Sequence, residues 1–266
     1  MTKSVPALAI MLGILCASAC IAVADPLQPG EVLNYTTTVT TIWKPPNDKF
    51  NPLPEAEYAK LPPRRDVMSY TFGVMVDRPD ADGSAQARIV LPARGPLPGQ
   101  NLEATVTADG QIVPKVDFVA IQAAGVDRNN PGAMIPAGYR SWTQAEQSNF
   151  WAYVADRKLL LFNEVALGAG KKKAFKAGDA WRIVIPDQDN QVIDFVFQGM
   201  QQFQGRDVAA IGFTTTRMTQ KGVGPVTGTA LYDLQHHLLV NLHVGGDDDT
   251  MMGVHYQTVD IVLQQQ

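Results

Sequence analysis

The chain has 266 residues, a net charge of −4 and two cysteines, Cys16 and Cys20. Both cysteines precede residue 25, so the rest of the chain offers no disulfide, thiolate metal site or cysteine nucleophile. The weakly acidic balance, without a long basic run, argues against nucleic acid as a partner.

The first 24 residues are typical of a cleavable secretion signal. Lys3 is the only charge, an apolar stretch runs from Val5 to Leu15, and small residues follow up to Ala24. A positive start, an apolar core and an A-x-A-like end predict export to the periplasm or secretion. A membrane-spanning helix needs roughly 20 apolar residues, and the small-residue end of this segment favours cleavage instead.

Cys20 gives the same segment a second interpretation. Ala17-Ser18-Ala19-Cys20 resembles the lipobox of bacterial lipoproteins, although that family prefers Leu where this chain has Ala17. Lipidation of Cys20 would anchor the protein to a membrane without a spanning helix. Cleavage after Ala24 would instead leave the protein free in the periplasm, so a membrane is a partner only in the lipidated form.

After the signal, the sequence predicts antiparallel β-strands. Glu31–Trp43 is rich in β-branched and aromatic residues, and further strand-like runs cover Val67–Val76, Ser84–Leu91 and Asn101–Thr107. Turn residues separate these runs. The proline-rich segment Pro45–Pro63 is predicted to be a long loop between the first two strands.

One helix is predicted between two groups of strands. Thr143 and Glu146 form a capping-box pattern, in which each side chain satisfies a free backbone N–H. Apolar residues then recur at helical spacing until Gly168 and Gly170. The helix is expected over residues 143–155; after that, a continued helix and a turn between two short strands are both open.

The strands after the helix repeat the plan of those before it. A single offset of 125 residues relates three pairs of segments: Val67–Phe72 with Val192–Phe197, Ser84–Leu91 with Ala209–Thr216, and Glu103–Val106 with Gly228–Leu231. A constant offset over several elements predicts an internal repeat.

The expected fold is therefore mainly β, or β-rich α+β. It comprises two similar, curved antiparallel β-units in tandem, with one helix between them or packed against them. The predicted divisions are a signal at 1–24, a first β-unit at 25–142, a linking helix region at 143–167 and a second β-unit at 168–266.

Two motifs of the second half resemble a class of uncharacterised exported bacterial proteins with tandem β-units. Gly178-Asp179-Ala180-Trp181 matches the G-D-x-W stretch that opens the second unit of that class, and Thr227–Asp233 with Leu239-Val240 matches a later strand pattern. The class has no settled activity, so no functional residue carries over. The layout is more distantly similar to periplasmic lipoprotein-carrier proteins, which implies a curved sheet around a helix-plugged hydrophobic cavity and binding of acyl chains.

All four histidines lie between residues 236 and 255 and suggest a metal site. Alternation places His237 and His243 on one face of a strand, and a hairpin centred near Asp249 would bring His255 opposite His243. Imidazole pairs suit zinc or copper, and nearby carboxylates could complete the coordination shell. An exposed hairpin face with an acidic tip explains the same pattern without metal, so the sequence requires no cofactor.

The apolar stripe of the predicted helix contains Phe150, Trp151, Val154 and Phe162. In one interpretation these side chains line a cavity between the helix and a curved sheet, where a lipid or another apolar small molecule binds. In the other they fill that space as core, which is the usual role of such a stripe.

Catalytic motifs are absent from the sequence. It contains no G-x-S-x-G elbow, and the glycines at 222, 224 and 228 lack the lysine of a phosphate-binding loop. The sequence therefore favours an exported binding or structural protein without catalytic activity, with an apolar ligand as its partner. A metal-binding envelope protein and an uncharacterised hydrolase are the alternatives.

Overall fold

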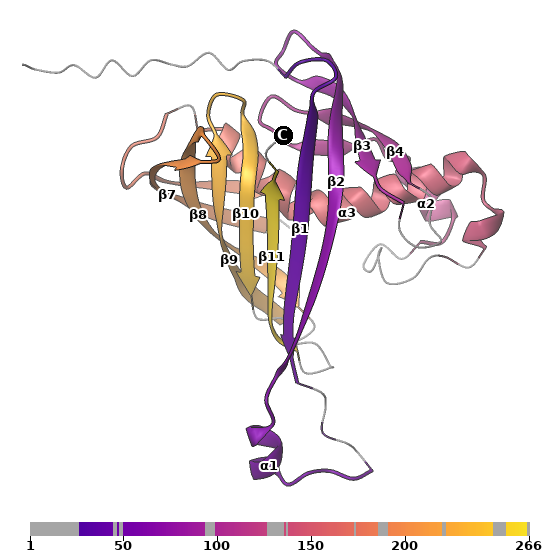
Figure 1. Ribbon diagram of the computed structural model, residues 1–266, viewed down its shortest axis with the longest axis vertical. Coiled ribbons are helices and arrows are strands. Elements are labelled where there is room, and N and C mark those ends of the chain that lie inside the picture. The colour runs from indigo at the N-terminus through magenta and orange to yellow at the C-terminus, as the bar shows by residue number, and fades with distance from the viewer. Residues whose placement is uncertain are drawn as a thin grey trace, which may run out of the picture.

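The computed structural model describes residues 27–44, 47, 50–93, 99–126, 136, 138–172, 174–185, 191–219, 222–246 and 254–264. Within these ranges, eleven strands form one curved antiparallel sheet in the order β5-β4-β3-β2-β1-β11-β10-β9-β8-β7-β6 (Figure 1). The mainly β fold is therefore confirmed. The predicted signal, with Cys20 and Ala24, lies outside the described residues, so export and lipidation stay predictions.

The first half of the sheet is a meander in which each strand pairs with the next. Long, β-branched β1 pairs with β2 along its whole length, whereas β3 pairs with only the second part of β2, from Gly73 onward. The five strands are β1 (Val32–Trp43), β2 (Arg64–Pro79), β3 (Ala85–Leu91), β4 (Gln100–Val106) and β5 (Ile112–Pro114).

The second half is also a meander, and its last strand closes back onto the first strand of the chain. Pairing of β11 with β1 places Leu263 opposite Tyr35 and Val259 opposite Val39, so the two halves share one sheet. The six strands are β6 (Ala180–Ile185), β7 (Gln191–Phe203), β8 (Arg206–Thr219), β9 (Gly222–Asp233), β10 (Leu238–Gly246) and β11 (Val254–Leu263).

The single offset of 125 residues relates β2 to β7, β3 to β8 and β4 to β9, but it does not preserve which residues face the core. It correctly equates Phe72 with Phe197, which both face the core. It then equates buried Ile89 with exposed Thr214, and buried Leu102 with exposed Thr227. Both β2 and β7 have an irregularity, but residues 80–84 connect β2 to β3, whereas only residues 204 and 205 connect β7 to β8. The shorter connection moves β8 out of step with β3, and a shift by an odd number of residues exchanges the two faces of a strand. The division into two related units stays a prediction.

One long helix, α3 (Gln144–Gly170), lies against the concave face of the sheet. Its capping box is present in full, with Thr143 Oγ1 accepting from the Glu146 backbone N–H and Glu146 accepting from the Thr143 N–H. The interpretation as two short strands after residue 155 is wrong. Gly168 lies inside the helix, where a Cβ would overlap the ring of Phe195.

Three short helical segments accompany α3. They are α1 (Glu55–Lys60), α2 (Phe118–Ala123) and the 3₁₀ turn η1 (Tyr139–Ser141). The segment Pro45–Pro63, predicted as a loop, thus contains one short helix. No helix in the described part of the chain combines the length and apolar character needed to cross a membrane.

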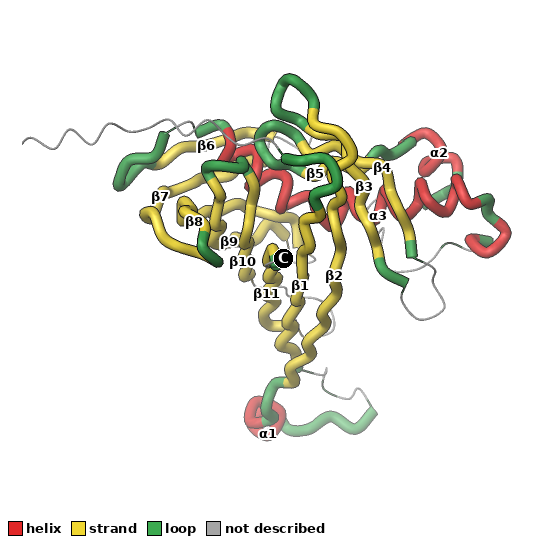
Figure 2. The backbone as a smooth tube through the Cα atoms, turned by 45° about the horizontal axis from the view of Figure 1, so that its top comes forward, coloured by secondary structure: helices red, strands yellow, loops and turns green. Residues whose placement is uncertain are grey.

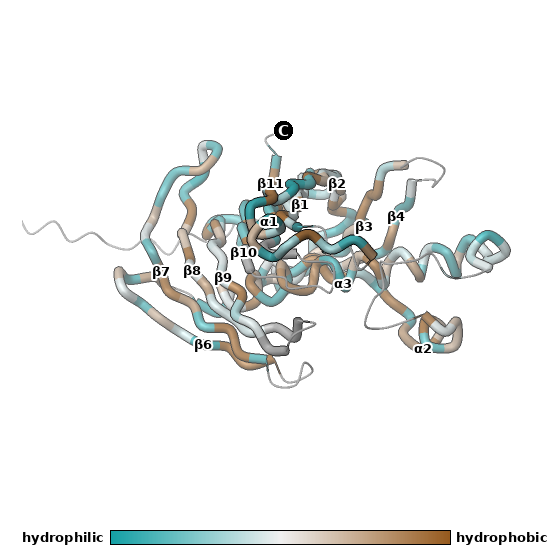
Figure 3. The backbone as a smooth tube through the Cα atoms, turned by 90° about the horizontal axis from the view of Figure 1, so that it is seen from below, coloured by the Kyte–Doolittle hydropathy of each residue, from teal (hydrophilic) through white to brown (hydrophobic). Residues whose placement is uncertain are grey.

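The main core lies between α3 and the sheet that curves around it (Figures 2 and 3). In Figure 3, strands β6 to β9 lie on one side of α3 and strands β3 and β4 on the other. The helix contributes Ala152, Ala155, Leu159, Phe162, Val165, Ala166 and Ala169 to this core. Because apolar strand faces surround it on several sides, α3 is buried around most of its circumference.

Both edges of the sheet are tied to α3 by side-chain hydrogen bonds. At β5, Asn163 accepts from the Ile112 N–H (2.7 Å) and donates to the Ile112 carbonyl (2.8 Å). At β6, the Trp181 indole N–H donates to the Gly168 carbonyl (2.9 Å). Asn163 thus pairs with backbone groups of the edge strand β5, and Trp181 with a backbone carbonyl near the end of α3. Edge strands and helix ends leave such groups without a partner in their own element.

Candidate functional site

The concave face of the sheet extends beyond the part that α3 covers. At the level of the helix, the paired inner residues Tyr35, Phe72 and Leu263 are buried. Four residues further along each of these strands, on the same face, Val39, Met68 and Val259 lie side by side on β1, β2 and β11. Met68 is 47% exposed, and Val39 and Val259 are partly exposed.

Tyr70 and Lys158 mark the border of this uncovered region. Tyr70 lies between Phe72 and Met68 on the inner face of β2 and is partly exposed. The Lys158 ammonium of α3 lies 4.9 Å from the centre of the Tyr70 ring. We call Val39, Met68, Tyr70 and Val259 the open inner surface. It is an apolar strip with one positive charge at its border.

The open inner surface ends where polar residues begin. The next inner-facing residues, away from α3, are Thr41 on β1, Asp66 on β2 and Gln257 on β11. Gln257 Nε2 donates to Thr41 Oγ1 (3.3 Å). Strands 4.7–4.9 Å apart make the row Met68–Val39–Val259 about 10 Å wide. These dimensions suit a slender apolar group rather than a large flat partner.

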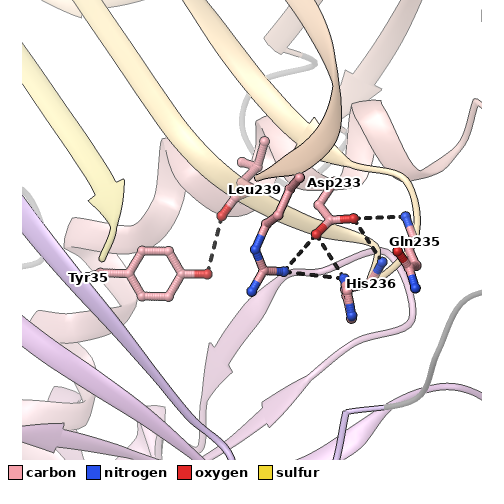
Figure 4. A network of polar contacts seen from close by, with 6 residues as sticks. Tyr35, Asp233, Gln235, His236 and Leu239 are labelled. Atoms are coloured by element: carbon pink, nitrogen blue, oxygen red, sulfur yellow. Dashed lines mark hydrogen bonds and ion pairs between the residues drawn. The ribbon is translucent and has the colours of Figure 1, made fainter. Parts of the chain in front are cut away.

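A second candidate is a polar cluster at the turn between β9 and β10 (Figure 4). The Asp233 side chain is 2% exposed, and its Oδ2 lies 2.8 Å from both Arg206 Nη1 and His236 Nδ1. Its Oδ1 accepts from the backbone N–H groups of Gln235 (2.8 Å) and His236 (3.1 Å). The carboxylate therefore holds the turn and two cationic or polar partners at once.

The electrostatics of this cluster favour an ionised Asp233. Burial alone would raise the pKa of Asp233, but the hydrogen bonds from Arg206 and His236 outweigh it, and the pKa is lowered. Because Asp233 Oδ2 can only accept when ionised, His236 Nδ1 carries the proton between them. Such an Asp–His pair can orient an imidazole, yet all the contacts of Asp233 serve the turn and its neighbours, which is a structural role.

Neighbouring contacts join this turn to the opposite half of the molecule. The Tyr232 hydroxyl donates to the Asp109 carbonyl (3.3 Å) in the turn between β4 and β5, and it lies 3.3 Å from His237 Nδ1. Gly110 (φ +81°) contacts the His237 backbone so closely that a Cβ would overlap its carbonyl oxygen. The Tyr232-Asp233 pair of the predicted strand motif thus fixes two turns, which the sequence did not indicate.

The predicted histidine site is not assembled as expected. His237 lies in the turn before β10, with φ +54°, rather than on the strand face beside His243. His243 lies opposite Asp260 instead of His255, and its Nδ1 is 2.6 Å from Asp260 Oδ1. The two corrections have separate causes: β10 begins at Leu238, after His237, and the register of β10 with β11 centres their hairpin further along than residue 249. His255 belongs to β11, and its side chain lies outside what the structure describes.

Metal binding by these histidines stays a prediction. In the ranges that the structure describes, no three His, Asp or Glu side chains are grouped so that they could hold a metal ion.

The four predicted cavity residues are divided between two packing clusters. Phe162 is in the main core, where its ring meets Tyr35 edge-on at 5.6 Å. Phe150 and Val154 pack with α2 and η1 in a smaller cluster, and Trp151 donates to the Tyr139 hydroxyl (2.6 Å) at its border. Trp151 packs against both clusters, and the role of the four residues in ligand binding stays a prediction.

The open inner surface escaped sequence reasoning, although the sequence contains a signal for it. Met68, Tyr70 and Phe72 alternate along β2, and β2 is longer than β3, its neighbour. Where β2 extends past the end of β3, its residues have no neighbouring strand on that side, and its inner face is more exposed. The lengths of both strands were needed to see this, and only the structure gives them.

Comparisons with known proteins assign no family. No family model matches the sequence, and no curated protein matches it. Among solved structures, the chain is similar to a candidate exported protein with a YmcC-like fold from Bacteroides fragilis, with 11% identity and a TM-score of 0.37 over 92% of this chain and 100% of that chain. The class defined by the structure itself is an unclosed, curved antiparallel sheet around one long helix.

Proposed function

We propose that this chain is an exported, non-catalytic protein that binds an apolar ligand on its open inner surface. The observation that supports the proposal most is the exposure of Met68 on the concave face of β2, two inner-facing positions beyond buried Phe72 of the same strand. A core would bury such a residue, and an apolar strip left on a concave face favours a ligand.

The positive charge of Lys158, at the border of the open inner surface, favours a ligand with an acidic group. Lys158 holds its ammonium over the Tyr70 ring, next to the apolar strip. An ammonium there attracts an acidic group while the strip takes the apolar part. A single alkyl chain with a carboxylate therefore fits better than a bulky neutral molecule. The export signal at residues 1–24 adds the expectation that binding takes place in the cell envelope.

Dansyl-undecanoic acid is a suitable probe, because its emission rises when it leaves water. We expect saturable binding to the purified protein and about tenfold weaker binding by Met68→Gln, because the variant removes an apolar contact and buries an amide. The measurement is a fluorescence titration at constant protein concentration.

Val67→Gln is the matched control. Val67 is the preceding residue of the same strand, is 58% exposed, and faces the outer side of the sheet. It should bind the probe as the unmodified protein does. Equal losses in both variants, or no saturable binding by the unmodified protein, would contradict the proposal.

A further inference from the structure

The segment between β1 and β2 forms a tip that projects away from the body of the sheet (Figure 1). The tip contains α1 and the described residues around it. Three of its large apolar side chains are exposed: Phe50 (99%), Leu53 (41%) and Leu61 (38%). An exposed apolar group of this kind on an otherwise folded protein marks a place of interaction.

Hydrogen bonds order this tip instead of burying its apolar side chains. The Asn47 amide group donates to the Leu53 carbonyl and accepts from the Leu53 N–H, both at 2.8 Å. Lys44 Nζ donates to the Ala59 carbonyl (3.0 Å), and the Pro54 carbonyl starts α1 by accepting from Tyr58 (2.9 Å). The backbone is thus fixed in a form that presents Phe50 and Leu53 to the surroundings.

The neck of the tip combines aromatic and cationic side chains. The Arg64 guanidinium lies 5.4 Å from the Trp43 ring centre, and Lys44 Nζ lies 4.7 Å from the Tyr58 ring centre. Arg65 is exposed beside Arg64. Exposed apolar side chains combined with Trp, Tyr, Lys and Arg are typical of a membrane interface. The two carboxylates of α1, Glu55 and Glu57, are outnumbered by four cations of the tip and its neck: Lys44, Lys60, Arg64 and Arg65.

We propose that this tip docks on an anionic lipid surface. Phe50, Leu53 and Leu61 enter the interfacial region, the aromatic rings of the neck lie at head-group level, and the cations meet lipid phosphates. A second copy of the chain fits less well, because three side chains at the end of a narrow hairpin offer far less than the roughly 800 Å² per partner of a stable interface. The inference does not rest on the open inner surface, which lies on the same two strands beyond Thr41 and Asp66.

Cosedimentation with vesicles of phosphatidylethanolamine and phosphatidylglycerol tests the proposal. The exported protein is used in a Cys20→Ser background, so that no lipid anchor contributes. We expect binding that weakens at least about tenfold in Phe50→Ser/Leu53→Ser. Arg64→Gln/Arg65→Gln should weaken it by about fivefold per charge and reduce its salt dependence. Val119→Ser/Met200→Ser is the matched control, because both residues are exposed but lie away from the tip, and it should bind normally.

A second readout does not depend on loss of binding. In Phe50→Trp, vesicles should shift the tryptophan emission to shorter wavelengths, because the ring leaves water. No shift, no cosedimentation of the parent protein, or unchanged binding by Phe50→Ser/Leu53→Ser would overturn the proposal. So would a concentration-dependent dimer that the same substitutions abolish, which would identify the tip as a contact between copies.

Discussion

At the residue scale, Asp233 shows how one buried carboxylate holds a hairpin together. It ends β9, accepts two backbone N–H groups of the following turn, and pairs with Arg206 on the adjacent strand β8. A buried carboxylate is stable only when its partners replace the water that it has lost. Each of its neighbours therefore depends on the charge of Asp233.

Asp233→Asn removes this charge while leaving an acceptor for the turn. We expect the free energy of unfolding at neutral pH to fall by about 2 kcal/mol, because hydrogen bonds to charged groups are the strong ones. The pKa of Asp233 lies below its usual value of 3.8 in the folded protein. Its stabilisation is therefore present above pH 3.8 and is lost as the pH falls toward the lowered pKa.

Urea denaturation at a series of pH values measures both effects. The curves of the unmodified protein and of Asp233→Asn should differ at neutral pH and converge below pH 3.8. Asp194→Asn is the control, since it removes an exposed ion pair with Arg182 and should change stability little. A constant difference down to the acid end would show that the charge of Asp233 does not contribute.

At the element scale, both ends of α3 have a signal in the sequence, whereas its continuation after residue 155 was left open. The capping box of Thr143 and Glu146 is a local signal, and it fixes the first turn. The rest of the helix is buried on several sides, which removes the polar face that a periodicity argument needs. Gly168 and Gly170 indicate a helix end in the sequence, and α3 does end at Gly170. Both positions need glycine, because Phe195 and Asp109 approach them closely.

Asn163 and Asn149 make the same kind of contact at two depths on α3. Asn163 pairs with both backbone groups of Ile112 in a buried place, and Asn149 pairs with both backbone groups of Asp117 in an exposed one. Asn163→Ala should therefore cost about 2 kcal/mol, because it leaves two buried backbone groups without a partner.

Asn149→Ala should have a much smaller effect, because water can replace the amide. Equilibrium unfolding measures the difference, and hydrogen exchange adds a local readout. The Ile112 amide should lose protection in Asn163→Ala but not in Asn149→Ala. Equal stability of the two variants would mean that the β5 edge does not depend on α3.

At the scale of the whole molecule, composition and alternation were enough for the fold class but not for the arrangement. Alternation correctly placed His243 on the face of β10 opposite to buried Leu242 and Val244. It failed across elements, because the β7–β8 connection is shorter than the β2–β3 connection, and because β10 begins only after His237. The open inner surface is likewise a product of unequal strand lengths, and no short motif encodes it.

A pair of glycines, Gly110 and Gly178, can test whether the close contact between the β4–β5 turn and the β9–β10 turn contributes to stability. Gly110 and Gly178 both have φ +81°, so alanine strains the backbone equally at each. A Cβ at Gly178 meets nothing within 4 Å, whereas at Gly110 it overlaps the His237 carbonyl. Gly110 lies in the β4–β5 turn and His237 in the β9–β10 turn, so that overlap pushes the two halves apart.

Gly110→Ala should therefore destabilise the protein by about 2 kcal/mol more than Gly178→Ala, which is the usual cost of forcing extra volume into a packed contact. Urea denaturation of both variants isolates this difference, since the backbone strain is common to both. The loss should be accompanied by weaker protection of the Leu238 amide, which follows the displaced carbonyl. Equal destabilisation would mean that the two turns only touch, and that the halves are held together by β1–β11 pairing and α3 alone.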